Sequence, residues 1–92
     1  MAVISGHVGQ NTANIVVTYN HVNSSIRSVQ SFSDASGNHT SIALQPGVYV
    51  VTARALGLVF SSVSVTIDGA NPQDQIVNLR SRAVNASNTS AI

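Results

Sequence analysis

The chain has 92 residues, a formal net charge of +1 and no cysteine, and 43% of its residues are hydrophobic although only 4% are aromatic. A chain of this length supports one domain with a single thin core, which excludes a separately walled, deep active-site cavity. Without cysteine, disulfides and thiolate metal sites are also excluded.

The charged residues are unusual because lysine and glutamate are both absent. The chain carries four arginines and three aspartates, so its surface must consist mainly of Ser, Thr, Asn and Gln. Arginines scattered along a chain of net charge +1 give no phosphate-binding patch, which argues against nucleic acid as a partner. A charge this low also permits close association, so the composition favours a protein covered by neighbours in an assembly or tethered outside the cell.

Short segments with β-branched residues and period-two alternation predict strands, and Gly, Asn, Asp and Pro clusters separate them. Segment 26–33 has no purely apolar side, as in an edge strand. Segment 48–55 is apolar enough on both sides to be a central strand, with Tyr49, Val51 and Ala53 on one face. In chain order, we expect strands near residues 3–8, 14–19, 26–33, 39–44, 48–55, 59–67 and 75–80.

Turn signals lie between several of these segments. Asp34 and Gly37 supply the side-chain acceptor and the positive φ of a tight turn. Asp68 followed by Gly69 is typical of a hairpin. Residues 81–92 are small and polar without periodicity, so we expect a domain at residues 1–80 and an extended C-terminal arm at 81–92. The predicted fold is all-β, a single immunoglobulin-like or prealbumin-like sandwich of about seven strands.

One stretch of the sequence carries a family pattern. The turn Asp34-x-x-Gly37 is followed by Leu44, a Pro-Gly turn, Tyr49-x-Val51-x-Ala53 and then Gly57. This order resembles the carboxypeptidase regulatory-like family of prealbumin-like β-sandwiches. The opening residues 4–8 and the closing residues 77–79 also resemble that family, over roughly residues 3–80. The resemblance implies the sandwich fold and leaves function open, because most family members are accessory modules.

No set of residues predicts catalysis or a cofactor. His7, His21 and His39 are too far apart in sequence for a local metal motif, and we expect packing or surface roles. The aspartates lie mostly in turns, which explains them better than a calcium site does. No Ser, His and Asp set can be argued from spacing, and no glycine-rich phosphate loop is present. The N-terminal residues lack the pattern of a cleaved signal, and no segment is long and apolar enough for membrane insertion.

Two functional hypotheses remain, and neither is an enzyme. The first is a structural accessory protein, a phage capsid decoration or head-associated protein on the virion surface, which binds a capsid or copies of itself through its sandwich edge and termini. Its predicted partner-binding residues are Ala83, Val84, Asn85, Ala86 and Ile92.

The alternative is a carbohydrate-binding or cell-adhesion module of a secreted, extracellular protein. It would contact surface glycans with a loop set that includes an exposed Tyr19. The predicted ligand residues are Tyr19, His21, Asn23, Asn38 and His39.

Overall fold

The computed structural model describes residues 1–84, which form nine strands and no helix. This confirms the all-β prediction. The strands are β1 Ile4–His7, β2 Val16–His21, β3 Val29–Phe32, β4 Asn38–Thr40, β5 Gly47–Arg54, β6 Leu58–Phe60, β7 Val63–Ile67, β8 Gln75–Ile76 and β9 Ser81–Ala83.

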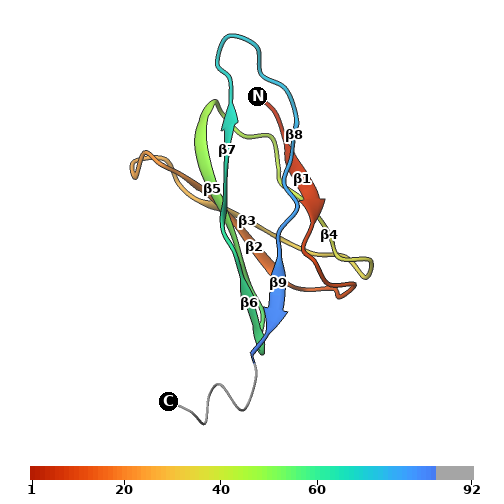
Figure 1. Cartoon of the computed structure of the whole chain (residues 1–92). Coiled ribbons are helices and arrows are strands. Elements are labelled where there is room, and N and C mark those ends of the chain that lie inside the picture. Colours follow the sequence, from red (N-terminus) through yellow and green to blue (C-terminus); the bar gives the residue numbers. More distant parts are fainter. Residues whose placement is uncertain (85–92) are drawn as a thin grey trace.

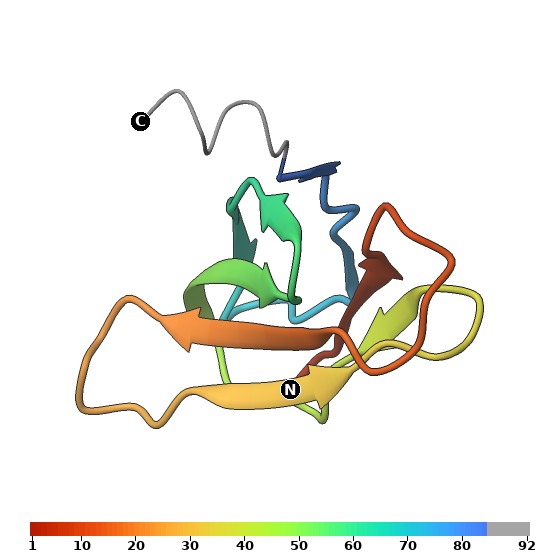
Figure 2. The ribbon, with the colours of Figure 1, turned by 90° about the horizontal axis from the view of Figure 1, so that it is seen from below.

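The strands are arranged in two layers (Figures 1 and 2). One layer is an antiparallel sheet in the order β3-β2-β5-β7, in which β5 is central and β3 lies at an edge, as their sequence patterns predict. The other contains the sheet β4-β1-β8, where β1 pairs antiparallel with β4 and parallel with β8. An antiparallel ribbon of β6 and β9 completes the sandwich.

One expected strand changes partners along its length and the start of the expected arm forms a further strand, which is why about seven predicted segments become nine strands. Only Ser61 and Ser62 separate β6, which pairs with β9, from β7, which pairs with β5. The last segment follows β1 as far as Leu79, whose N donates to His7 O at 2.8 Å, and then pairs with β6. Residues 81–83 are therefore a strand, and the prediction that the arm begins at residue 81 is wrong at this point.

The core lies between the layers and comes from alternate positions of the long strands. On β5 the side chains of Tyr49, Val51 and Ala53 all point inward, which confirms that they share one face. Inward and outward positions alternate because strand side chains have a period of two. The buried apolar residues are Ala2, Ile4, Val8, Ile15, Val17, Tyr19, Leu44, Tyr49, Val51, Ala53, Ile67, Val77 and Leu79.

The two predicted turns differ in outcome. Asp34 Oδ1 accepts hydrogen bonds from Ser36 N and Asn38 N, both at 2.9 Å, and Gly37 has a φ of 82°, so the tight turn before β4 is confirmed. These hydrogen bonds hold the pKa of Asp34 below its usual value, and the bond from Asn38 N has the largest effect. The prediction of a hairpin at Asp68-Gly69 is wrong, because β7 and β8 belong to different sheets and a longer loop joins them.

Candidate functional site

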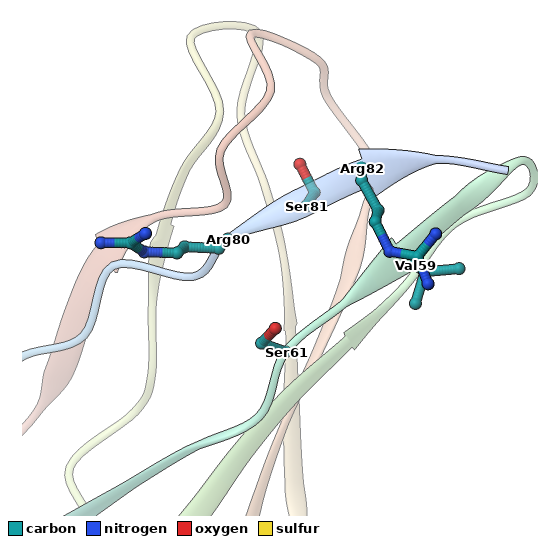
Figure 3. A pocket seen from close by; sticks show the side chains of 5 residues that line it. All are labelled: Val59, Ser61, Arg80, Ser81 and Arg82. Carbon is teal, nitrogen blue, oxygen red and sulfur yellow. The ribbon is translucent and has the colours of Figure 1, made fainter. Parts of the chain in front are cut away.

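A shallow hollow of about 100 Å³ lies on the ribbon formed by β6 and β9 (Figure 3). The strand register places Val59 opposite Arg82, and Ser61 N donates to the Arg80 carbonyl at 3.0 Å. Arg82 lies on β9, Arg80 directly precedes this strand, and both side chains are exposed. The hollow is lined by Val59, Ser61, Arg80, Ser81 and Arg82.

The side chains that line the hollow point in different directions. Figure 3 shows Arg82 extending toward Val59 on the neighbouring strand, while Arg80 extends away from it. Ser81 is half-buried, and its Oγ accepts a hydrogen bond from Gln10 Nε2 at 3.1 Å. This bond ties β9 to the loop after β1. Arg82 and the adjacent Arg80 therefore belong to a segment that is held by β6 and by the loop after β1.

Two of the three aspartates lie far along the domain from the hollow. Asp68 and Asp74 lie in the loop between β7 and β8, at the end of the domain opposite to β9 (Figure 1). Asp74 Oδ1 accepts a hydrogen bond from Val3 N at 2.9 Å. Among residues 1–84 no carboxylate lines the hollow, so Arg80 and Arg82 give it a local positive charge. Guanidinium groups bind carboxylates and phosphates through paired hydrogen bonds, and this arrangement can therefore hold an anionic group of a partner.

Two of the residues predicted to contact a glycan are buried. Tyr19 is 0% exposed and His39 is 1% exposed, so the prediction of an exposed Tyr19 is wrong. Tyr19 Oη lies 2.7 Å from His39 Nδ1 and 2.8 Å from Ser31 Oγ. His39 Nε2 lies 2.8 Å from the Val77 carbonyl oxygen. These contacts form a polar bridge across the core from β2 to β4 and the segment after β8.

The hydrogen-bond directions in this bridge follow from elementary chemistry. The Val77 carbonyl can only accept, so His39 Nε2 carries a proton, and the neutral ring accepts at Nδ1 from the Tyr19 hydroxyl. The Ser31 hydroxyl then donates to Tyr19 Oη. Burial is the main cause that lowers the pKa of His39 and raises the pKa of Tyr19. The bridge is therefore a structural element of the core.

Of the other three predicted ligand residues, His21 and Asn23 lie together, because Asn23 N donates to His21 Nδ1 at 2.9 Å, whereas Asn38 lies apart from them. Asn23 lies in the loop between β2 and β3, and its Oδ1 accepts hydrogen bonds from Ser25 N and Ser25 Oγ at 3.1 and 2.8 Å. His21 is half-buried, with its ring edge-on to Tyr49 at 4.9 Å. Asn38 is exposed on β4, on the opposite side of the domain from the β2–β3 loop in both Figures 1 and 2.

The predicted partner-binding residues continue directly from the hollow. Ala83 ends β9, and Val84 N donates to the Gly57 carbonyl at 2.9 Å while its side chain stays exposed. Asn85, Ala86 and Ile92 lie outside the described residues. At the other terminus Ala2 is buried and forms a bridge to Leu44, so the first residues are tied into the sandwich.

Sequence reasoning missed the hollow itself, because it treated the arginines as scattered. The available signal was their spacing, since Arg80 and Arg82 supply two of only four cationic side chains and lie two positions apart. Within residues 1–84, no group of three or more His, Asp or Glu side chains could hold a metal ion. No helix in that part of the chain is long and apolar enough to cross a membrane.

Comparison with known proteins adds no family. No protein-family model matches the chain, and no curated protein matches it.

Proposed function

We propose that this chain is a non-enzymatic structural accessory module that attaches to a larger protein assembly, with a phage capsid as the assembly and the virion surface as its location. The observation that supports this role is the arginine hollow on β9, because this strand leads directly into the predicted partner-binding residues. Attachment would place acidic groups of the partner against Arg80 and Arg82. The arm after Val84 would extend the contact.

The edge of the larger sheet gives a second element of the same attachment. In the part of the chain that the structure describes, β3 pairs with β2 on one side only, and its Phe32 side chain is 63% exposed. An open edge offers backbone N–H and C=O groups to an extended segment of a partner, and an exposed aromatic side chain adds apolar contact. Both features fit a module that acts by binding.

The carboxypeptidase regulatory-like family is part of this proposal. The confirmed Asp34–Gly37 turn and the central position of β5 support the resemblance, since both belong to the stretch that carries the family pattern. Accessory function is also what the resemblance implies. A glycan-binding role has less support, because Tyr19 and His39 are buried and Asn23 and Asn38 lie on different sides of the domain.

The test compares two variants that lose the same charge at different places. Arg80→Gln/Arg82→Gln removes both guanidiniums of the hollow, and Arg27→Gln/Arg54→Gln removes two exposed arginines elsewhere. We expect the wild-type chain to co-sediment saturably with capsids isolated from the same source. The hollow variant should bind roughly tenfold or more weakly, as for the loss of charge-assisted hydrogen bonds.

The control variant separates specific attachment from general charge attraction. Arg27→Gln/Arg54→Gln should keep the wild-type affinity, because neither residue lines the hollow. Equal loss of binding in both variants would contradict attachment through β9. A wild-type chain that never sediments with the capsids would contradict the proposed function as a whole.

A further inference from the structure

The outer edge of β7 is an open sheet edge. β7 ends the sheet β3-β2-β5-β7 and pairs only with β5 among the described residues. The contact of this part of the chain with β9 ends at Ser61, and both Figures 1 and 2 show β7 and β8 standing apart. An edge of this kind presents a row of backbone donors and acceptors to any extended strand that approaches it.

Within the strand itself, β7 lacks the residues with which proteins protect open edges. From residue 58 to residue 67 the chain contains no charged residue, no proline and no glycine. Asp68 directly follows β7, so the charge nearest to this edge lies beyond the end of the strand and not within it. With five residues, β7 is also the longest of the four edge strands of the two main sheets, and a longer edge offers more backbone donors and acceptors.

We propose that β7 pairs antiparallel with β7 of a second copy of this chain, around a two-fold axis at Val65. In this register Ser64 lies opposite Thr66 of the second copy, and Val63 lies opposite its Ile67. The two four-stranded sheets then form one continuous sheet. This inference goes beyond the proposed attachment to an assembly, because the partner is the chain itself and the surface is distinct from β9.

The register follows from the burial pattern of β7. Val63, Val65 and Ile67 point inward with partial or full burial, whereas Ser64 and Thr66 point outward and are exposed. Residues directly opposite each other in an antiparallel pair lie on the same face of the sheet. Pairing around Val65 keeps inward residues opposite inward residues over the whole strand, and a one-residue slip would place them opposite Ser64 or Thr66.

The same pattern explains why a second copy fits as the occupant. Pairing of two identical strands brings hydroxyl side chains opposite hydroxyl side chains and β-branched apolar side chains opposite each other, which are favourable cross-strand pairs. No charged residue of β7 approaches its own copy at the axis. A two-fold contact also closes on itself, so it yields a dimer and not an open fibre.

The experiment uses charge pairs that depend on the proposed register. Ser64→Lys/Thr66→Lys places Lys opposite Lys twice, and Ser64→Lys/Thr66→Asp places Lys opposite Asp twice. Ser28→Lys/Gln30→Lys is the matched control, because it adds the same charge as the first variant at exposed positions of the β3 edge. Sedimentation equilibrium is measured from about 1 µM to about 1 mM chain, after circular dichroism has established that each variant is folded.

We expect the wild type to dimerise with a dissociation constant on the order of 1 to 100 µM, as for a small interface. The Lys/Lys variant should raise that constant roughly tenfold or more, because like charges oppose each other. The Lys/Asp variant and the β3 control should stay near the wild-type value. Amides of β7 in the wild type should also exchange more slowly at high than at low protein concentration.

Several outcomes would overturn the inference. A wild-type chain that is monomeric over the whole concentration range would do so, as would a Lys/Lys variant that dimerises like the wild type. A Lys/Asp variant as weak as the Lys/Lys variant would contradict the register. Ser64 and Thr66 lie on β7, whereas Arg82 lies on β9 and Arg80 directly precedes it. Capsid binding can therefore succeed while dimerisation fails, and dimerisation can succeed while capsid binding fails.

Discussion

The polar bridge through the core should make the Tyr19 hydroxyl important for stability. Tyr19→Phe removes one oxygen atom and leaves the ring in place. It breaks the contacts of 2.7 Å to His39 Nδ1 and 2.8 Å to Ser31 Oγ. Among residues 1–84, every buried side-chain nitrogen or oxygen has a hydrogen-bond partner. The substitution therefore creates an unpaired acceptor at His39 Nδ1, in a side chain that is 1% exposed.

The expected loss of stability depends on whether water can replace the Tyr19 hydroxyl as the hydrogen-bond partner of Ser31 and of His39. Ser31 is half-buried, so its hydroxyl can find a water molecule, but buried His39 Nδ1 cannot. An unsatisfied buried polar group costs about 1 to 3 kcal/mol, so we expect the free energy of unfolding to fall by about 2 kcal/mol. For a domain of this size, that loss corresponds to a decrease in Tm of roughly 8 to 16 °C.

Tyr49→Phe is the matched control. The Tyr49 hydroxyl donates to the Gln45 carbonyl at 2.6 Å, and Gln45 is exposed, so water can replace the lost donor. Its removal should cost only about 1 kcal/mol. Urea unfolding at pH 7.5, followed by circular dichroism, gives both values. A Tyr19→Phe variant that loses no more stability than Tyr49→Phe would refute the reasoning.

Two further predictions concern pH and backbone packing. Burial lowers the pKa of His39 below its ordinary value of 6.5, so the unfolded chain binds a proton first as the pH falls. The contribution of neutral His39 to the free energy of unfolding should therefore be fully present above about pH 6.5 and should be lost as the pH falls toward the lowered pKa of the folded state. A free energy of unfolding in urea that does not change between about pH 7 and pH 5 would contradict this. Gly6→Ala should cost at least about 2 kcal/mol, because a Cβ would clash with the Val77 carbonyl oxygen where β1 and β8 run parallel. Ser5→Ala on the same strand should change stability by less than about 1 kcal/mol, and equal thermal unfolding of the two variants would argue against the close approach.

Local signals predicted the parts of the fold that depend on neighbours in the chain. The alternation on β5 placed Tyr49, Val51 and Ala53 on one face, which is the buried one in the structure, because side-chain direction on a strand repeats every two residues. The Asp34 and Gly37 turn was equally readable, since a side-chain acceptor and a positive φ are properties of those residue types. The mixed polarity before Phe32 likewise indicated an edge strand.

Features that depend on distant partners were not readable in the same way. Ser81-Arg82-Ala83 has no apolar pattern, and it is a strand because Leu58–Phe60 lies beside it. His39 has a polar side chain, yet it is buried because Tyr19 and the Val77 carbonyl satisfy both ring nitrogens. Neither partner lies near it in sequence.

The division between the two kinds of information has a physical basis. Residue type and spacing determine the strand period, the turns, the all-β class and the low charge, because these depend on covalent geometry and on side chains within a few positions. Strand pairing, partner switching at Ser61 and the meeting of Arg80, Arg82 and Ser61 around one hollow depend on contacts between segments far apart in the chain. Those contacts are decided by the packing of the two layers, since only the assembled core determines which edges are covered and which remain open.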